Sequence, residues 1–214
     1  MSERPKEHAW KACMQETASR VRIPLPPNRA SSVVGVLLKR LEAGVAKFHE
    51  EPEARNKVRS LASGQKPHTL FITCADARID PALITQTHPG ELFILRNIGN
   101  MIPPFEAHEI SITAALEFAV RFLEITDIII CGHSDCGAVR AIVEGSTPMI
   151  NQWVMHGVGD ARENVLQQLR NLRGYPFLRD IRSYGWYIDI GEATVYAYDE
   201  RKKKFAQIRG SAIS

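Results

Sequence analysis

Two short segments of the chain carry side chains that could do chemistry together. Cys74, Asp76 and Arg78 lie in CADAR, and His133 and Cys136 lie in HSDC, further along the chain. Thiolate and imidazole groups are preferred ligands of zinc. Cys74, His133 and Cys136 would supply three ligands and leave the fourth tetrahedral position free, which is typical of catalytic rather than structural zinc. The spacing H-x-x-C alone is a weak signal, because buried cysteines often act as small apolar residues.

Cys131 leaves a second interpretation open. It lies two residues before His133 and therefore on the same face of an extended strand. As a fourth ligand it would close the site and make it structural. Against this, a cysteine inside a strand points into a packed layer, whereas the other candidate ligands lie at strand ends. Cys13 lies in an irregular N-terminal segment, and we interpret it as a bystander.

Asp76 and Arg78 favour the catalytic interpretation. An open zinc site can lower the pKa of bound water to about 7 and so provide hydroxide at neutral pH. A carboxylate that accepts a hydrogen bond from this hydroxide would direct its lone pair at a substrate. Arg78 could keep Asp76 ionised and fixed through a paired contact. The alternative for this pair is a surface ion pair of little energetic value.

The surrounding pattern predicts the elements that position these residues. Apolar runs at 69–74, 91–95 and 127–133 are typical of buried parallel strands covered on both faces. Helical periodicity follows at 110–124, 137–145 and 161–172, and an earlier amphipathic helix is expected from residue 31 to about 51. Alternation around Gly191 indicates a C-terminal hairpin. We therefore expect an α/β fold with a mainly parallel central sheet, an antiparallel edge strand and flanking helices, in which ligands bind at the carboxyl ends of the strands.

Length and charge narrow the functional class. The chain has 214 residues and a net charge of +3, with 27 basic and 24 acidic residues. This balance does not favour nucleic-acid or membrane binding, and the basic run 201–204 is expected to be a solvated turn or strand edge. With no apolar run of about 20 residues and no signal core, we expect a cytoplasmic protein. Residues 1–30 are expected to form a peripheral arm, and residues 31–214 a single zinc-enzyme domain.

Together, CADAR and HSDCG resemble the paired signature C-x-D-x-R and H-x-x-C-G of the β-class carbonic anhydrases. The similarity extends from about Gln65 to Tyr198, includes PGELFILRNIGNMIPP between the motifs, and is greatest to the cyanobacterial and plant-like branch. The resemblance implies one zinc ion per subunit, bound by the three ligands named above, with the Asp76 and Arg78 pair orienting the reaction. It also implies that Cys131 is not a ligand.

The resemblance further implies reversible hydration of carbon dioxide to bicarbonate and a proton. It assigns substrate contacts to Gln65, which binds substrate or product oxygens, to Phe93, Ile98 and Phe118 as apolar walls, and to Gly137 through its N–H. It also implies a homodimer or a dimer of dimers with the active site near the interface. Two alternatives remain: a carbon disulfide or carbonyl sulfide hydrolase on the same scaffold, and a non-enzymatic structural zinc module.

Some positions depart from the family pattern. One branch carries an inhibitory bicarbonate site made of a tryptophan, an arginine and a tyrosine. The arginine position matches Arg96, but Phe71 and Ile188 occupy the other two positions. We therefore expect this control site to be absent. The stretch 153–163 is also shorter than in relatives.

Overall fold

The computed structural model describes residues 30–210, with side chains from residue 36 onward. The predicted arm and Cys13 thus lie outside the described residues. The chain divides between Asn56 and Lys57 into two units. The first contains helix α2 (Ala30–Glu50), as the amphipathic pattern predicted, and α3 (Pro52–Ser60) spans the boundary. The large apolar side chains of α2 from Val36 to Phe48 are exposed. The assignment of residues 31–56 to the enzyme domain stays a prediction.

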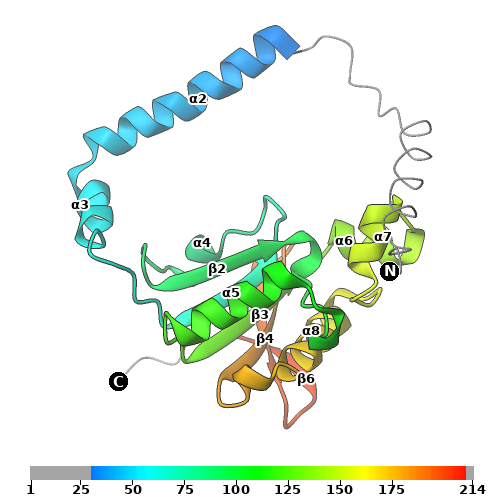
Figure 1. The fold of residues 1–214 in the computed structure, drawn as a ribbon. Helices are drawn as coiled ribbons and strands as arrows, with labels where there is room; N and C mark the ends of the chain where they lie inside the picture. Colours follow the sequence, from blue (N-terminus) through cyan, green and yellow to red (C-terminus); the bar gives the residue numbers. More distant parts are fainter. Residues whose placement is uncertain (1–29, 211–214) are drawn as a thin grey trace, which may run out of the picture. The chain divides into compact units, whose positions relative to one another are not determined.

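The second unit is built on a six-stranded sheet in the order β2-β1-β3-β4-β5-β6 (Figure 1). Strands β1 (Thr69–Cys74), β2 (Leu92–Asn97), β3 (Asp127–His133) and β4 (Arg182–Asp189) are parallel. Strands β5 (Thr194–Asp199) and β6 (Lys204–Gln207) are antiparallel to their neighbours. The prediction of a mainly parallel sheet with an antiparallel edge is confirmed. The pattern missed β6, so the edge is a three-stranded meander rather than a hairpin.

Side-chain alternation along the central strands builds the core. Leu70, Ile72, Ile128 and Ile130 point to one face of the sheet and are fully buried. Helices α5 (Ile110–Arg121) and α8 (Ala161–Arg173) pack their apolar residues onto this face. The intervening residues of β1 and β3 form a separate apolar cluster on the opposite face. Because both faces of β1 are covered, its six residues are all buried, which explains the uninterrupted apolar run in the sequence.

Shorter elements connect the core to the sheet edge. Helix α6 (Gly137–Glu144) follows β3, as predicted, whereas α4 (Pro81–Thr85) and α7 (Pro148–Val154) were missed. Three short 3₁₀ turns complete the unit: η1 (Ile98–Asn100), η2 (Phe105–Ala107) and η3 (Pro176–Leu178). Proline begins both α4 and α7, where its missing N–H costs nothing.

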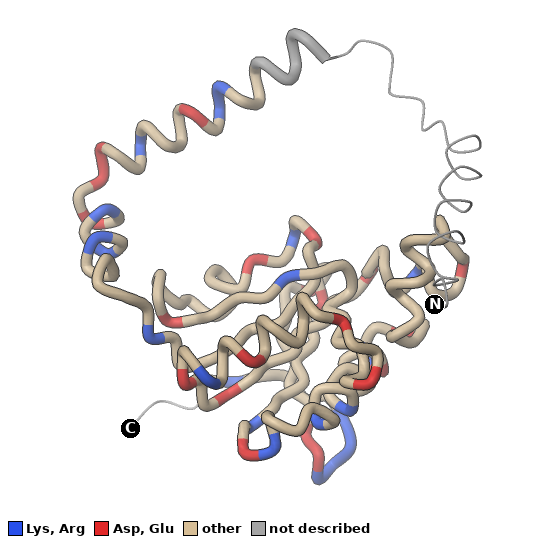
Figure 2. Tube along the Cα trace, viewed as in Figure 1, with Lys and Arg blue, Asp and Glu red and all other residues tan. Residues whose placement is uncertain are grey.

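Charged residues of both signs are interspersed along the trace (Figure 2). The basic run begins in the turn between β5 and β6, where the side chain of Asp199 accepts hydrogen bonds from two of its backbone N–H groups. The run is therefore part of a tight turn, as expected. Within residues 30–210, no helix combines the length and the apolar character that crossing a bilayer requires.

Candidate metal centre

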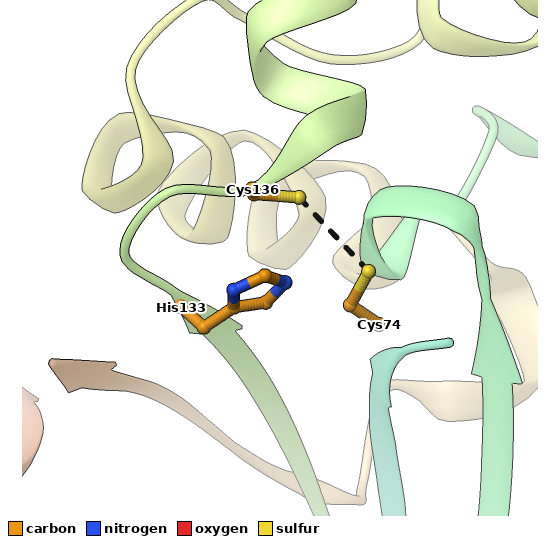
Figure 3. Close-up of side chains that lie close together, drawn as sticks. All are labelled: Cys74, His133 and Cys136. Carbon is orange, nitrogen blue, oxygen red and sulfur yellow. Dashed lines mark hydrogen bonds between the residues drawn. The ribbon is translucent and has the colours of Figure 1, made fainter. Parts of the chain in front are cut away.

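Three predicted ligands converge at the carboxyl edge of the sheet (Figure 3). Cys74 ends β1, His133 ends the neighbouring strand β3, and Cys136 is the N-cap residue of α6. Their ligand atoms all lie within 4.8 Å of one another, and the two sulfur atoms are 3.9 Å apart. All three residues are at least 95% buried. Adjacent parallel strands thus bring together residues that are far apart in the sequence.

The histidine is oriented as a metal ligand would be. His133 Nδ1 lies 2.8 Å from the carbonyl oxygen of Ser134, which can only accept, so Nδ1 carries the proton and donates. Nε2 then presents its lone pair to the sulfur atoms. This atom is buried and has no hydrogen-bond partner. An unpaired buried nitrogen is costly, whereas a metal ion among two thiols and this nitrogen would satisfy it. The donor set therefore fits a zinc ion.

The two thiols share one hydrogen-bond system. The hydrogen bond between them lowers the pKa of Cys74 and raises the pKa of Cys136. Burial opposes the first shift, and His133 together with the Gly99 N–H, 3.3 Å from Cys74 Sγ, reinforces it. The pair is thus arranged to carry negative charge on sulfur, as a thiolate ligand requires.

Asp76 and Arg78 form a closed pair beside the three ligands. Arg78 donates to both carboxylate oxygens of Asp76, from Nε at 2.9 Å and from one terminal nitrogen at 2.8 Å. Its backbone N–H also donates, at 2.9 Å. These hydrogen bonds hold the pKa of Asp76 well below its usual range. The carboxylate is therefore ionised at neutral pH, and its Oδ2 lies 3.9 Å from His133 Nε2.

Further polar residues that sequence reasoning did not assign to the site hold this turn. Arg96 donates to the carbonyl oxygens of Cys74 and Asp76, at 3.1 and 2.7 Å. Asp135 accepts from Arg78 at 3.1 Å and from Arg140 at 3.0 Å. Arg96 was noted only as a possible anion contact. In the structure its guanidinium binds the main chain, and the residues at the other two control-site positions belong to an apolar cluster.

Cys131 lies apart from the three ligands. Its side chain is fully buried in the apolar cluster on the face of the sheet opposite α5 and α8, and burial raises its thiol pKa to about 12. A thiol that resists deprotonation is a poor metal ligand. The group of residues that could hold a metal contains Cys74, His133 and Cys136 and does not include Cys131.

The loop after β2 is fixed by buried amide side chains of α8. Gln168 accepts from the Ile102 N–H at 2.7 Å, Asn171 donates to the Ile102 carbonyl at 2.8 Å, and Asn164 donates to the Gly99 carbonyl at 3.2 Å. These three amides are at least 91% buried. They hold η1 against the end of β1, where the Gly99 N–H reaches Cys74 Sγ. These contacts depend on how α8 packs against the loop in the folded chain, so no local sequence pattern predicts them.

A cavity of about 330 Å³ opens beside the predicted ligands. Cys74 and Asp76 line it together with two of the predicted substrate residues, Ile98 and Gly137, and its other lining residues are Ala75, Ala138, Ala141, Ser146 and Ile150. None of these five residues was predicted to belong to the site. A groove of about 610 Å³ lies at the amino ends of β3 and β4, but neither cysteine nor histidine lines it, so we place the chemistry in the smaller cavity.

The other three predicted substrate residues lie elsewhere in the subunit. Phe93 pairs with Leu70 near the start of β1, about 13 Å from the level of Cys74 at 3.3 Å per residue. The ring of Phe118 on α5 lies 6.0 Å from that of Phe93. Gln65 is exposed and precedes β1. Within one chain, these three residues and the cluster of ligands therefore occupy opposite ends of the strand.

Comparison with known proteins identifies the family. The family model described as carbonic anhydrase matches residues 69–161. A carbonic anhydrase of Synechocystis is 37% identical over 195 residues, which cover 76% of this chain and 71% of that protein. The chain belongs to the β-carbonic anhydrase family. A carbonic anhydrase of Pseudomonas aeruginosa is 34% identical, covering 77% of this chain and 89% of that protein.

Solved β-carbonic anhydrases share the fold. The structure of the β-carbonic anhydrase CcaA superposes with a TM-score of 0.76 at 35% identity, covering 82% of this chain and 93% of that chain. One structure from a study of two tetrameric β-carbonic anhydrases of Sordaria macrospora gives 0.64 at 25% identity, covering 78% and 97%. The recognised family is thereby confirmed. Carbonic anhydrases are lyases, and this chain is an enzyme of that class.

Proposed function

We propose that the chain catalyses the reversible hydration of carbon dioxide to bicarbonate and a proton, with one zinc ion per subunit. Cys74, His133 and Cys136 would hold the ion. The observation that carries the proposal is the unpaired, buried Nε2 of His133, which lies with two cysteine sulfur atoms and beside an ionised aspartate. Cys74 and Asp76 of this group line a cavity. When bound, zinc supplies a nucleophile at neutral pH by lowering the pKa of coordinated water.

The chain's own residues orient the reaction. Asp76 stays ionised because of Arg78, so it can only accept hydrogen bonds, and it fixes the direction of a donor placed next to His133. Arg78 is itself held by Asp135. Because the aspartate has three hydrogen bonds from one arginine, its carboxylate is preorganised and needs no rearrangement during the reaction.

The cavity walls divide into apolar and polar parts. Ile98 provides an apolar surface suited to carbon dioxide, which carries no net charge. Gly137 is the first residue of α6, where backbone N–H groups have no intrahelical partner. Its N–H can therefore donate to a bicarbonate oxygen as negative charge develops. A Cβ at this position would meet nothing within 4 Å, so the backbone is open to a small ligand.

A homodimer would complete the site. Gln65, Phe93 and Phe118 cannot reach the metal centre of their own chain, so a second copy would have to supply them. The surface of β2 and α5 supports such an interface, because large apolar side chains are exposed there: Ile94, Ile110, Phe118 and Phe122. The exposed apolar stripe of α2 offers further surface to cover. Since the solved Sordaria macrospora relatives are tetramers, a dimer of dimers is the larger assembly to expect.

The remaining parts of the proposal concern partners and location. The substrate is a small molecule, and the basic and acidic residues interspersed along the chain (Figure 2) favour neither nucleic acid nor a lipid surface as partner. A cytoplasmic location fits the reduced cysteines that metal binding requires. Hydrolysis of carbon disulfide or carbonyl sulfide would use the same centre and is distinguished by assaying sulfide release.

The experiment that tests the function measures carbon dioxide hydration and bound zinc on the same samples. Wild type should hydrate carbon dioxide with one zinc per chain, and Cys74→Ser and His133→Ala should lose zinc and activity together. Zinc-loaded protein without hydration activity would refute the proposed reaction. Mixing Cys74→Ser subunits with Gln65→Ala subunits tests the shared site, because one of the two sites in a mixed dimer would then have all its residues intact. The mixed dimers should hydrate carbon dioxide faster than either variant alone. Activity no higher than that of the single variants, in confirmed mixed dimers, would contradict the shared site.

A further inference from the structure

One peptide unit connects a tryptophan to a predicted zinc ligand. The N–H of Gly99 donates to Cys74 Sγ at 3.3 Å. The carbonyl of the same peptide unit belongs to Ile98, and it accepts a hydrogen bond from the indole Nε1 of Trp153 at 2.7 Å. Trp153 lies on α7, 55 residues from Ile98 in the sequence. A donor on the carbonyl polarises the amide, so the two hydrogen bonds strengthen each other.

This peptide unit would have an alternative orientation without the tryptophan. Gly99 has φ 79° and ψ 18°, in the left-handed region. Glycine adopts positive and negative φ about equally well, so a flip of the Ile98–Gly99 peptide has little local cost. The flip would turn the carbonyl oxygen toward the sulfur and remove the only N–H that this loop directs at Cys74 among the described hydrogen bonds. No residue with a side chain, whose backbone would be less free to flip, fits at position 99, because a Cβ at Gly99 would lie 2.7 Å from the Cβ of Ala138.

We propose that Trp153 is a positioning residue for the metal centre. Its indole N–H holds the Ile98–Gly99 peptide in the orientation that directs the Gly99 N–H at Cys74 Sγ. An N–H donor on a ligand sulfur withdraws charge and fixes the direction of the remaining lone pairs, as other outer contacts to metal ligands do. This inference rests on the proposed zinc site, and it gives α7, which already contributes Ile150 to the cavity wall, a hydrogen bond that positions a metal ligand.

The surroundings of Trp153 support this role over packing alone. Its ring packs between the main core and the smaller cluster that contains Cys74 and Cys136, so the indole is held from both sides. Asn164 fixes the next peptide along, through the Gly99 carbonyl at 3.2 Å. The Ile98 side chain on the held unit lines the cavity. One indole therefore sets both a sulfur contact and an apolar wall.

The test compares two tryptophan substitutions of the same kind. Trp153→Phe keeps an aromatic ring and removes the N–H. Trp186→Phe is the matched control, since Trp186 is similarly half-buried but packs edge-on against Phe71 on the opposite face of the sheet. A third protein carries β-(3-benzothienyl)alanine at position 153, which keeps the shape of the indole and replaces its N–H by sulfur. This version guards against loss of packing in Trp153→Phe.

Two quantities are measured on each full-length protein. The first is the hydrogen-exchange rate and proton chemical shift of the Gly99 amide, in the metal-free and the zinc-loaded state. The second is the rate at which a chelator removes zinc. Both position-153 proteins should exchange the Gly99 amide hydrogen faster than wild type and release zinc about tenfold faster. Tenfold is the lower end of the effect that losing an outer-shell contact has on metal affinity. Trp186→Phe should match wild type in both.

Unchanged Gly99 exchange and zinc release in the benzothienyl protein would overturn the proposal, as would equal changes in Trp186→Phe. A result in which Trp153→Phe changes and the benzothienyl protein does not would assign the effect to packing and also overturn it. If wild type binds no zinc, the proposed function fails, and Gly99 exchange in the metal-free protein still decides whether Trp153 holds this peptide.

Discussion

Exchanging Asp76 for asparagine separates the orienting role of the carboxylate from metal binding. The structure gives Asp76 three hydrogen bonds from Arg78, at 2.8 to 2.9 Å. An asparagine has one acceptor oxygen, so its NH₂ group must either face the guanidinium or point at the reacting region as a donor. The carboxylate that accepts a hydrogen bond from the reacting donor is then lost. A positioned acid–base group of this kind contributes about 10²- to 10⁴-fold to the rate. Asp76→Asn should lower kcat by that amount and retain zinc.

Asp135→Asn is the matched control for this substitution. It makes the same chemical change and affects the same arginine, because Asp135 accepts from Arg78 at 3.1 Å. Its side chain is 62% exposed, against 17% for Asp76. Exposed ion pairs are worth about 0.2–1 kcal/mol, which limits the loss in kcat to about fivefold. The assay is stopped-flow carbon dioxide hydration, normalised to bound zinc.

Two outcomes would refute this reasoning. If Asp76→Asn kept more than about a hundredth of kcat, the loss would fall below the range of a positioned acid–base group. Equal losses for Asp76→Asn and Asp135→Asn would assign the effect to Arg78 or to charge in general, because the control removes an exposed carboxylate that binds the same arginine.

Two further predictions follow from burial and charge. Cys131→Ala should keep one zinc per chain and lower the free energy of unfolding by about 1 kcal/mol, because it deletes one fully buried atom; loss of zinc would instead make Cys131 a ligand. Arg78 holds the pKa of Asp76 below its value in the unfolded chain, which is about 3.9. The ionised carboxylate therefore stabilises the folded state fully above about pH 4. This stabilisation is lost as the pH falls toward the lower pKa of the folded state. Acid denaturation of metal-free wild type should therefore show a steeper loss of unfolding free energy below about pH 4 than metal-free Asp76→Asn, and parallel curves would contradict this.

The strands and the ligand cluster could be predicted because their signals are local. An uninterrupted apolar run marks β1 as buried on both faces, and a cysteine at its end can be recognised without knowing the rest of the fold. Once β1 and β3 are parallel neighbours, their carboxyl ends must meet, and Cys74 and His133 are brought together. The ionised Asp76 beside Arg78 follows from two residues in one turn.

The features of the site that the sequence did not predict depend on contacts between distant segments of the chain. The side chains of Trp153 and Arg96 donate hydrogen bonds to main-chain carbonyls. Every residue has a main-chain carbonyl, so the sequence does not show which residue accepts such a bond. Helix α7 has only seven residues, too few for a periodic pattern. The position of Phe93 in the chain does not reveal that it lies at the opposite end of the strand from Cys74, because that depends on strand register.

X-ray absorption at the zinc edge tests the central claim most directly. The purified, active enzyme should show zinc with two sulfur neighbours at about 2.3 Å and two nitrogen or oxygen neighbours at about 2.0–2.1 Å. One of the lighter neighbours should be His133, and the other should be exchangeable with solvent. Three sulfur neighbours and one nitrogen would describe a closed structural site that includes Cys131, and would contradict the account of an open catalytic centre.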